Sequence, residues 1–233
     1  AHRGETIAIM GSNGSGKSTL LNLLSGLNEV QTGSVTINSQ TVNKARNQIG
    51  FLRQEPDLML LCGSIAEEIN WGNKHIDQRL TERIVSKLGL SNFLQEYPLA
   101  MSKGQRLRIV LASLLVKKPQ LLLLDEPTTG QDEQSLREVS RILRIYKKLG
   151  GCIIFCTHDV ELAAELADRA LIMQSGKIIA SGSPAEILSN QALVEDNGLQ
   201  LPPLVELCTQ LGIKPQIDIK GVLHYVKSSA LGR

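Results

Sequence analysis

Several features that would assign this chain of 233 residues to a common class of protein are missing from it. No apolar run approaches the ~18–20 residues of a membrane span, and no basic segment followed by an apolar stretch opens the chain. Charge of one sign is also missing, since 25 basic and 23 acidic residues leave a net charge of +2. A nucleic-acid-binding domain usually carries a basic stripe, so no nucleic-acid partner is expected. The sequence predicts a protein of the cytosol, or one held at a membrane surface.

Cysteines are few and lack the spacing of metal-binding or redox motifs. The four, at positions 62, 152, 156 and 208, include no C-x-x-C pair, and two lie in the apolar run CIIFC. Small thiols in such runs are typically buried, so we expect reduced, structural cysteines. The length of the chain allows one large domain with a lobe or a short appendage.

Short apolar runs alternate with segments of helical length. Runs of strand length lie at residues 6–10, 34–38, 49–52, 121–124, 152–156 and 170–173. Several are apolar without alternation, as strands covered on both faces are. Helical segments, such as 134–149 and 160–167, lie between them. This order predicts an α/β fold with a mainly parallel sheet.

One segment, residues 56–118, is instead mainly helical, and its last helix stops at Pro119. We therefore expect a domain of residues 1–188, in which a helical lobe is inserted into a core of 1–55 and 119–188. A short helical tail, residues 189–233, follows. An apolar stripe at helical spacing in this tail consists of Leu204, Leu207, Cys208 and Leu211.

The stretch GSNGSGKSTL, residues 11–20, fits the phosphate-loop pattern G-x-x-x-x-G-K-[ST] and follows the apolar run 6–10. Backbone N–H groups must converge on a phosphate there, which leaves no room for Cβ atoms and requires glycine. A helix beginning near Lys17 adds its partial positive charge. We expect Lys17 to reach the β- and γ-phosphates and the Ser18 hydroxyl to bind Mg²⁺. The predicted nucleotide-binding residues are Gly11, Ser12, Asn13, Gly14, Ser15, Gly16, Lys17, Ser18 and Thr19.

A second motif, LLLLDEP at residues 121–127, places two carboxylates after a buried strand. Open α/β sheets bind ligands at the carboxyl ends of their strands, so we expect Asp125 and Glu126 at the edge that carries the phosphate loop. Asp125 then suits the outer shell of Mg²⁺. Glu126 suits the γ-phosphate side, where it orients and deprotonates the attacking water.

Gln54 and His158 each follow a predicted strand. Such a residue is often only a polar strand end. Their shared position at the carboxyl ends of strands also fits γ-phosphate sensing, with Gln54 near Mg²⁺ and the water, and His158 on the γ-phosphate.

The stretch MSKGQ, residues 101–105, has two readings that the residues alone leave open. Ser102 and Gln105 spell a capping box at a helix start. Gly104, however, is a poor residue for a first helical turn unless something approaches the backbone closely, and an anion is the obvious candidate.

The order of these motifs, with TTGQD at residues 128–132 between LLLLDEP and His158, resembles the nucleotide-binding domain of an ABC ATPase over residues 4–188. The resemblance implies a P-loop NTPase fold, ATP and Mg²⁺ as ligands, and ATP hydrolysis. It also implies a head-to-tail dimer with ATP at the interface. Ser102, Gly104 and Gln105 would then serve the γ-phosphate of the partner's nucleotide. Asp132 would lie in the segment through which the two sites communicate.

Two departures from the family pattern stand out. The family signature usually has Leu at position 101 and Gly at 103, where this chain has Met101 and Lys103. Met101 keeps an apolar contact, whereas Lys103 adds a cation near the partner's phosphates and leaves the hydrolysis rate open. Only ten residues precede Gly11, where the family has about two strands and an aromatic residue that stacks on adenine. We therefore expect a piece of a longer polypeptide or a chain without those strands, with weaker adenine binding and an incomplete antiparallel edge.

Within the family, EPTTGQD and the tail beginning LPPLVELCTQLGI resemble the ATPase subunits of energy-coupling factor importers. That resemblance implies a motor subunit at the cytoplasmic face of the membrane, paired with an identical or sister ATPase domain through a helical tail. Residues 57–69 would line a groove for helices of a transmembrane scaffold subunit, although residues 58–61 packing inside the lobe is an equal reading. The alternative functions are a soluble ABC ATPase acting on ribosomes or DNA, and a regulator without turnover. Nothing in Gln54, Glu126 and His158 indicates a dead site.

Overall fold

The computed structural model describes residues 1–73, 76–129, 131–213, 215 and 217. Residues 218–233 of the predicted tail lie outside the described residues. The chain divides into two compact units. Unit 1 consists of Ala1–Glu5 and Ser18–Cys156, and unit 2 consists of Thr6–Lys17 and the residues from Thr157 onward. This division does not test the boundary predicted after residue 188, which stays a prediction.

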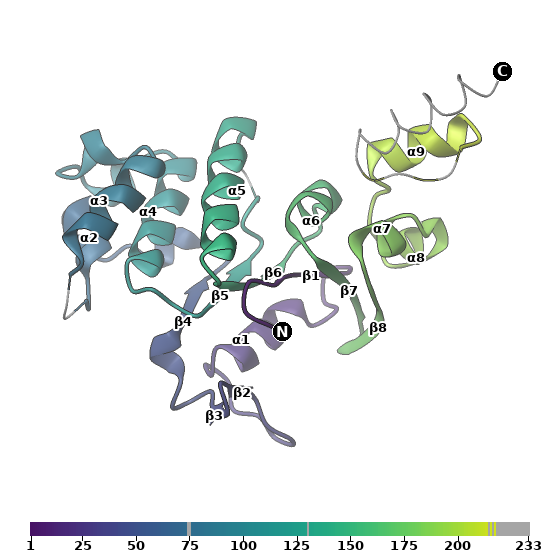
Figure 1. Ribbon diagram of the computed structural model, residues 1–233, viewed down its shortest axis with the longest axis horizontal. Coiled ribbons are helices and arrows are strands. Elements are labelled where there is room, and N and C mark those ends of the chain that lie inside the picture. Colours follow the sequence, from purple (N-terminus) through teal and green to yellow (C-terminus); the bar gives the residue numbers. More distant parts are fainter. Residues whose placement is uncertain (74–75, 130, 214, 216, 218–233) are drawn as a thin grey trace. The chain divides into compact units, whose positions relative to one another are not determined.

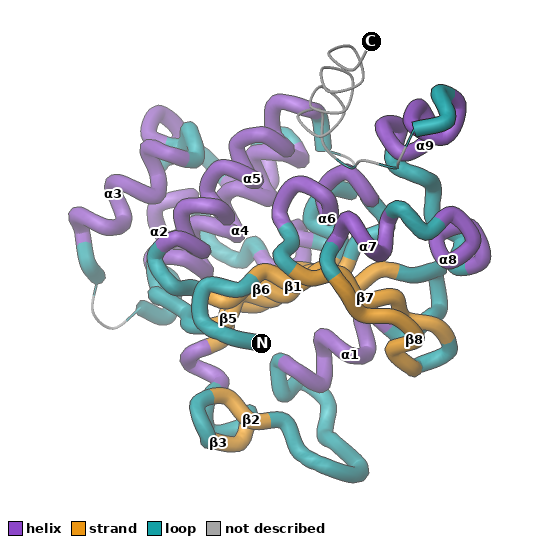
Figure 2. The backbone as a smooth tube through the Cα atoms, turned by 45° about the vertical axis from the view of Figure 1, so that its right-hand side comes forward, coloured by secondary structure: helices purple, strands orange, loops and turns teal. Residues whose placement is uncertain are grey.

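Unit 1 contains three parallel strands, β4 (Ile49–Leu52), β5 (Leu121–Asp125) and β6 (Cys152–Cys156). All residues of β5 and β6 are buried, which explains why their sequences are apolar without alternation. Figure 2 shows β5 and β6 side by side, and their register pairs Asp125 with Cys156. The predicted α/β fold with mainly parallel strands is confirmed.

Helices make up most of the remainder of unit 1. They are α1 (Lys17–Leu24), α2 (Ile65–Asn70), α3 (Gln78–Lys87), α4 (Lys103–Leu115) and α5 (Glu133–Lys148). Short 3₁₀ turns lie at Arg46–Gln48, Pro56–Met59, Ser91–Phe93 and Pro98–Ala100. Both α2 and α3 pack on α4, and Figure 1 shows the three helices side by side. The separate lobe of residues 56–118 stays a prediction. The chain leaves α4 with a positive φ of 52° at Lys118, directly before Pro119.

A small antiparallel hairpin of β2 (Thr36–Ile37) and β3 (Gln40–Thr41) also belongs to unit 1. The strand predicted at residues 34–38 was too long. Asn38 and Ser39 take left-handed backbone conformations, with φ of 49° and 63°, and form the hairpin turn. Asn tolerates this conformation better than most residues, so the turn ends the strand early.

Unit 2 pairs β1 (Thr6–Met10) in parallel with β7 (Arg169–Gln174), and β7 in antiparallel with β8 (Lys177–Gly182). The sequence analysis missed β8, because most of its residues are exposed and its composition is mixed. A turn at Ser175 and Gly176, both with positive φ, joins β7 to β8.

The helices of unit 2 are α6 (Val160–Leu166), α7 (Pro184–Leu188), α8 (Gln191–Asp196) and α9 (Pro203–Gln210). Only part of the predicted tail stripe is buried. Cys208 is fully buried beside Val205, whereas Leu207 and Leu211 are 42% and 59% exposed. All four cysteines are free and buried, as predicted. No helix among the described residues has the length and apolar character needed to span a membrane.

Candidate functional site

The loop between β1 and α1 has the backbone of an anion cradle. Gly11, Gly14 and Gly16 have φ of 144°, 79° and 103°, conformations that side chains disfavour. A Cβ at Gly11 would lie 2.2 Å from the carbonyl oxygen of Met173 in β7. The close approach of β7, together with the loop geometry, therefore requires glycine here.

Lys17 begins α1 and is only 7% exposed. Its Nζ donates to the carbonyl oxygens of Gly11, at 2.8 Å, and Ser12, at 3.1 Å. Carbonyl oxygens satisfy the ammonium without neutralising it, so its full positive charge stays inside the loop. The partial charge of the helix N-terminus adds to it.

Other groups of the loop also fit an anion. The Ser15 hydroxyl is buried and has no hydrogen-bond partner among the described residues. Ser12, Asn13, Ser18 and Thr19 are exposed, so their polar groups are open to a ligand. The loop therefore fits a phosphate chain on its own geometry.

Gln54, Asp125 and Glu126 lie at one edge of the unit 1 sheet. Because β4 and β5 are parallel with Leu52 opposite Leu124, the residues that follow them leave at the same edge. Asp125 is 6% exposed, Glu126 is half-buried and Gln54 is exposed. Their predicted roles stay predictions, but the edge brings an amide and two carboxylates together.

Glu126 has a left-handed backbone conformation, with φ of 49°. That conformation costs a residue with a side chain roughly 1–2 kcal/mol. Its N–H donates to the Cys156 carbonyl at 3.0 Å, so the turn is held by the neighbouring strand. Strained residues of this kind cluster at functional sites.

His158 is the second residue after the end of β6. It belongs to unit 2 and is exposed. The next residue, Asp159, is the N-cap of α6 and accepts from the Leu162 N–H at 2.9 Å. His158 is thus held between a strand end and a capped helix start.

At the start of α4, Ser102 and Gln105 form both halves of a capping box. The Gln105 N–H donates to Ser102 Oγ at 3.3 Å, and the Ser102 N–H donates to Gln105 Oε1 at 3.0 Å. Both side chains therefore have a local structural role.

Gly104 has a steric explanation within the chain. A Cβ at this position would lie 2.3 Å from the Ser135 hydroxyl oxygen and 3.1 Å from Ser135 Cβ, in the first turn of α5. The close approach expected from the sequence is therefore made by a serine side chain. Gly104 alone no longer argues for an anion.

The start of α5 is held by Asp132, its N-cap, which accepts from the Ser135 N–H at 2.7 Å. Hydrogen bonds from the Ser135 backbone and hydroxyl hold the pKa of Asp132 below its ordinary value. Gly104 and Asp132, predicted from separate motifs, thus meet at the same serine.

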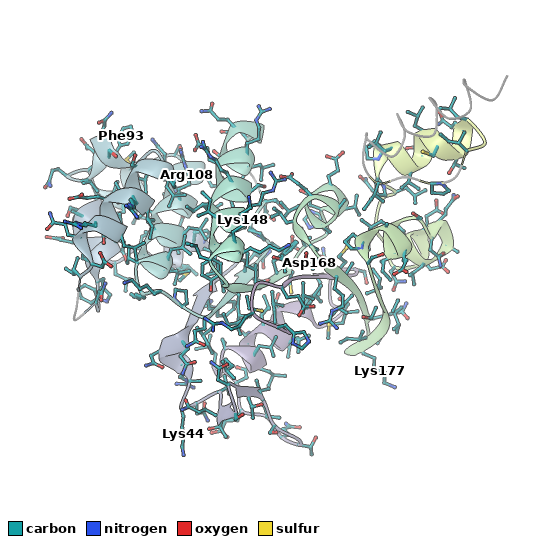
Figure 3. The ribbon with its side chains drawn as sticks, in the orientation of Figure 1. Lys44, Phe93, Arg108, Lys148, Asp168 and Lys177 are labelled. Atoms are coloured by element: carbon teal, nitrogen blue, oxygen red, sulfur yellow. The ribbon has the colours of Figure 1, made fainter. Side chains whose placement is uncertain are left out.

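Two arginines of α4 were not among the site residues predicted from the sequence. Arg108, labelled in Figure 3, donates to the Leu88 carbonyl at 3.0 Å and forms an ion pair with Glu138 of α5. Arg106 forms an ion pair with Asp57 at 2.9 Å. Charged residues within a largely apolar helix are the signal that would have drawn attention to them.

The segment of residues 57–62 presents leucines to solvent. Leu58 and Leu61 are 65% and 74% exposed, whereas Leu60 is buried. The buried carboxylate of Glu68 accepts from the N–H groups of Leu61, at 2.7 Å, and Cys62, at 2.8 Å. Leu60 thus packs inside the lobe, while Leu58 and Leu61 do not, and a groove for a partner helix stays a prediction.

The described residues contain no group of three or more His, Cys, Asp and Glu arranged to hold a metal ion. The ligands predicted for Mg²⁺ are one hydroxyl, one amide and one carboxylate, and only the carboxylate belongs to these four residue types, so they would not form such a group.

Comparison with known proteins gives matches along most of the chain. A family model described as "ABC transporter" matches residues 1–129. A putative ABC transporter ATP-binding protein of Methanosarcina acetivorans is 38% identical over 221 residues, 91% of this chain and 34% of that protein. The energy-coupling factor transporter ATP-binding protein EcfA1 of Methanospirillum hungatei is 34% identical over 226 residues, 92% of this chain and 82% of that protein. The chain thus spans about a third of the length of the Methanosarcina relative.

Among solved structures, cbiO1 from Clostridium perfringens matches with a TM-score of 0.74 and 29% identity. The match covers 89% of this chain and 88% of that chain, whose title describes it as part of the ABC transporter complex cbiONQ. This likeness confirms the predicted P-loop NTPase fold.

Proposed function

The chain belongs to the ABC transporter family, and from this premise we propose that it is an ATP-hydrolysing motor subunit of a membrane transporter. The observation that carries the proposal is the loop of residues 11–16, with the buried Lys17 ammonium held by its carbonyls. A loop of this form serves the phosphates of a nucleotide.

ATP is bound through its phosphates by the residues of this loop together with Ser18 and Thr19. Lys17 exchanges its carbonyl partners for phosphate oxygens, and the unpaired Ser15 hydroxyl gains an acceptor. Ser18 and Gln54 would hold Mg²⁺, with Asp125 in its outer shell, and the bound ion would neutralise part of the phosphate charge.

Hydrolysis is assigned to Glu126, which takes a proton from the attacking water. Its left-handed backbone is kept in place by the hydrogen bond to the Cys156 carbonyl, which fixes the point from which the side chain leaves the strand end. Gln54 orients the water from the same edge of unit 1, and His158 contacts the γ-phosphate.

The active form is a head-to-tail dimer with an identical or sister ATPase domain. Ser102, Gly104 and Gln105 of each chain serve the partner's nucleotide, and Asp132 lies in the segment that joins the two sites. The capping box occupies the Ser102 and Gln105 N–H groups. The additional donors are therefore other backbone N–H groups of the first turn of α4, which have no partner within a helix. Two apolar side chains are exposed at α9, Leu207 within the helix and Leu211 directly after it. They fit a second surface through which the two ATPase domains pair.

The transporter is an importer of the energy-coupling factor type, and the chain lies peripherally at the cytoplasmic face of the membrane. EcfA1 of Methanospirillum hungatei is described as an energy-coupling factor transporter ATP-binding protein, which supports the energy-coupling factor type. Leu58 and Leu61 supply the exposed apolar contact for a helix of the transmembrane scaffold subunit. Glu68 holds the backbone from which Leu61 projects.

The experiment that tests the proposal is light scattering of the Glu126→Gln variant with and without MgATP. This variant should bind ATP, turn over roughly 10²-fold more slowly or worse, and become a dimer only with MgATP. Lys17→Ala should lose ATP binding itself. Equal loss of binding in both variants would contradict the separate roles. A Glu126→Gln chain that binds ATP and stays monomeric would refute the homodimer and require a sister domain.

A further inference from the structure

Unit 1 has a hollow of about 500 Å³ at the amino ends of β5 and β6. Its floor includes Pro119 and Gln120, which precede β5, and Gly151, which precedes β6. Asp125 is the last residue of β5, at its opposite end, and Glu126 follows it. The hollow is therefore separate from the catalytic edge of this unit, and its volume lies within the range of small-molecule sites.

Aliphatic side chains from three helices line the interior. Ile84 of α3, Leu115 of α4 and Ile142 of α5 are buried, and Leu80 and Ile145 are half-buried. Leu149 at the rim is 78% exposed. An apolar ligand that covered these side chains would remove aliphatic surface from water.

One wall of the hollow is rigid. The Tyr146 hydroxyl donates to the Pro119 carbonyl at 2.9 Å. A Cβ at Gly151 would lie 2.2 Å from the Tyr146 ring, so the ring packs directly on the glycine backbone. A wall fixed in this way lowers the entropy lost when a ligand binds.

The polar lining is cationic. Arg3, Arg83, Lys87 and Lys118 line the hollow, and none of the described lining residues is a carboxylate. Lys118 is paired with Asp77 at 2.8 Å. Within the part of the chain that the structure describes, the other three form no ion pair. Arg83 and Lys87 are four residues apart on α3, so they lie on one face of the helix.

An aliphatic interior with unpaired cations at its rim is complementary to one kind of molecule. We propose that this hollow is a binding site for a long-chain carboxylate, whose chain lies on the aliphatic side chains and whose head group pairs with Arg83 and Lys87. A guanidinium binds a carboxylate in a bidentate manner, which suits a single monovalent head group. The site is independent of the nucleotide chemistry proposed above.

The test is isothermal titration of the full chain with dodecanoate, below its micelle concentration. We expect saturable binding with one molecule per chain that weakens as salt is raised. Arg83→Gln/Lys87→Gln should weaken it roughly fivefold to tenfold, because each exposed ion pair contributes a factor of a few. Dodecanol should bind the unaltered chain about as weakly as dodecanoate binds this double variant.

The matched control is Arg79→Gln/Arg141→Gln, which removes two exposed charges outside the hollow, one on α3 and one on α5. It should bind dodecanoate like the unaltered chain. Leu149→Ser should weaken binding of dodecanoate and dodecanol alike, since it removes apolar contact. The absence of saturable binding would overturn the proposal. Equal weakening in the two double variants would overturn it as well, because the attraction would then be general. ATP binding by each variant serves as the check on folding.

Discussion

Replacing Gly104 by alanine tests whether this glycine exists to admit the Ser135 side chain. The new Cβ would lie 2.3 Å from Ser135 Oγ and 3.1 Å from Ser135 Cβ. Overpacking of this kind costs about 1–3 kcal/mol, while alanine gains about 1 kcal/mol over glycine in a helix. The net destabilisation is therefore about 0–2 kcal/mol. For a chain of this size that lowers Tm by up to about 8 °C.

The assay is thermal unfolding of four proteins, with and without Gly104→Ala in the native and Ser135→Ala backgrounds. Ser135→Ala removes the atom at 2.3 Å but keeps the backbone N–H that Asp132 accepts. In that background Gly104→Ala should be neutral or raise Tm, because only the milder contacts remain, with Ser135 Cβ and with the Gln131 side-chain oxygen, each at 3.1 Å. The same Tm loss in both backgrounds would refute the steric account.

The same proteins separate packing from nucleotide chemistry. Each is combined with Glu126→Gln and examined for MgATP-dependent dimerisation. If the double variant Gly104→Ala/Ser135→Ala has a Tm no lower than that of Ser135→Ala but does not dimerise, Gly104 also admits the partner's phosphates. If it regains both, the glycine serves packing alone.

Three further predictions concern single groups. Glu68→Gln, which weakens a buried acceptor of two N–H bonds, should lower stability by about 1–3 kcal/mol in thermal unfolding. It should also speed thiol modification of Cys62, whose pKa burial and the Glu68 charge now raise. An NMR titration of Asp132 should give a pKa below its ordinary value, and this pKa should rise in Ser135→Ala. The ionised Asp132 carboxylate therefore stabilises the fold near neutral pH, and this stabilisation is lost as the pH falls through its pKa. Burial raises the pKa of Tyr146, so stability should fall as the pH rises past about 10 in unfolding experiments, and Tyr146→Phe should reduce that fall.

Several elements could be predicted from the sequence because a few neighbouring residues encode them. The strands at Leu121–Asp125 and Cys152–Cys156 are continuous apolar runs, and burial on both faces requires that composition. The capping box at Ser102 depends on two residues three apart. The phosphate loop is equally local, since its glycines and Lys17 lie in one short segment.

Elements with weak local signals were missed or misjudged. Strand β8 is an exposed partner of β7, so its pattern lacks the apolar run of a covered strand. The predicted strand at 34–38 ended early because two residues in left-handed conformations form a turn. Neither feature follows from hydrophobic periodicity.

The sequence by itself determined the phosphate-binding loop, the carboxylates after a buried strand and the α/β class, because each rests on residues adjacent in the chain. Tertiary structure alone decided what meets Gly104, which is the Ser135 hydroxyl. It also decided that Arg108 pairs with Glu138 and that unpaired cations surround an apolar hollow. These contacts join residues far apart in the chain, and only the packing of α3, α4 and α5 brings their side chains within reach of one another.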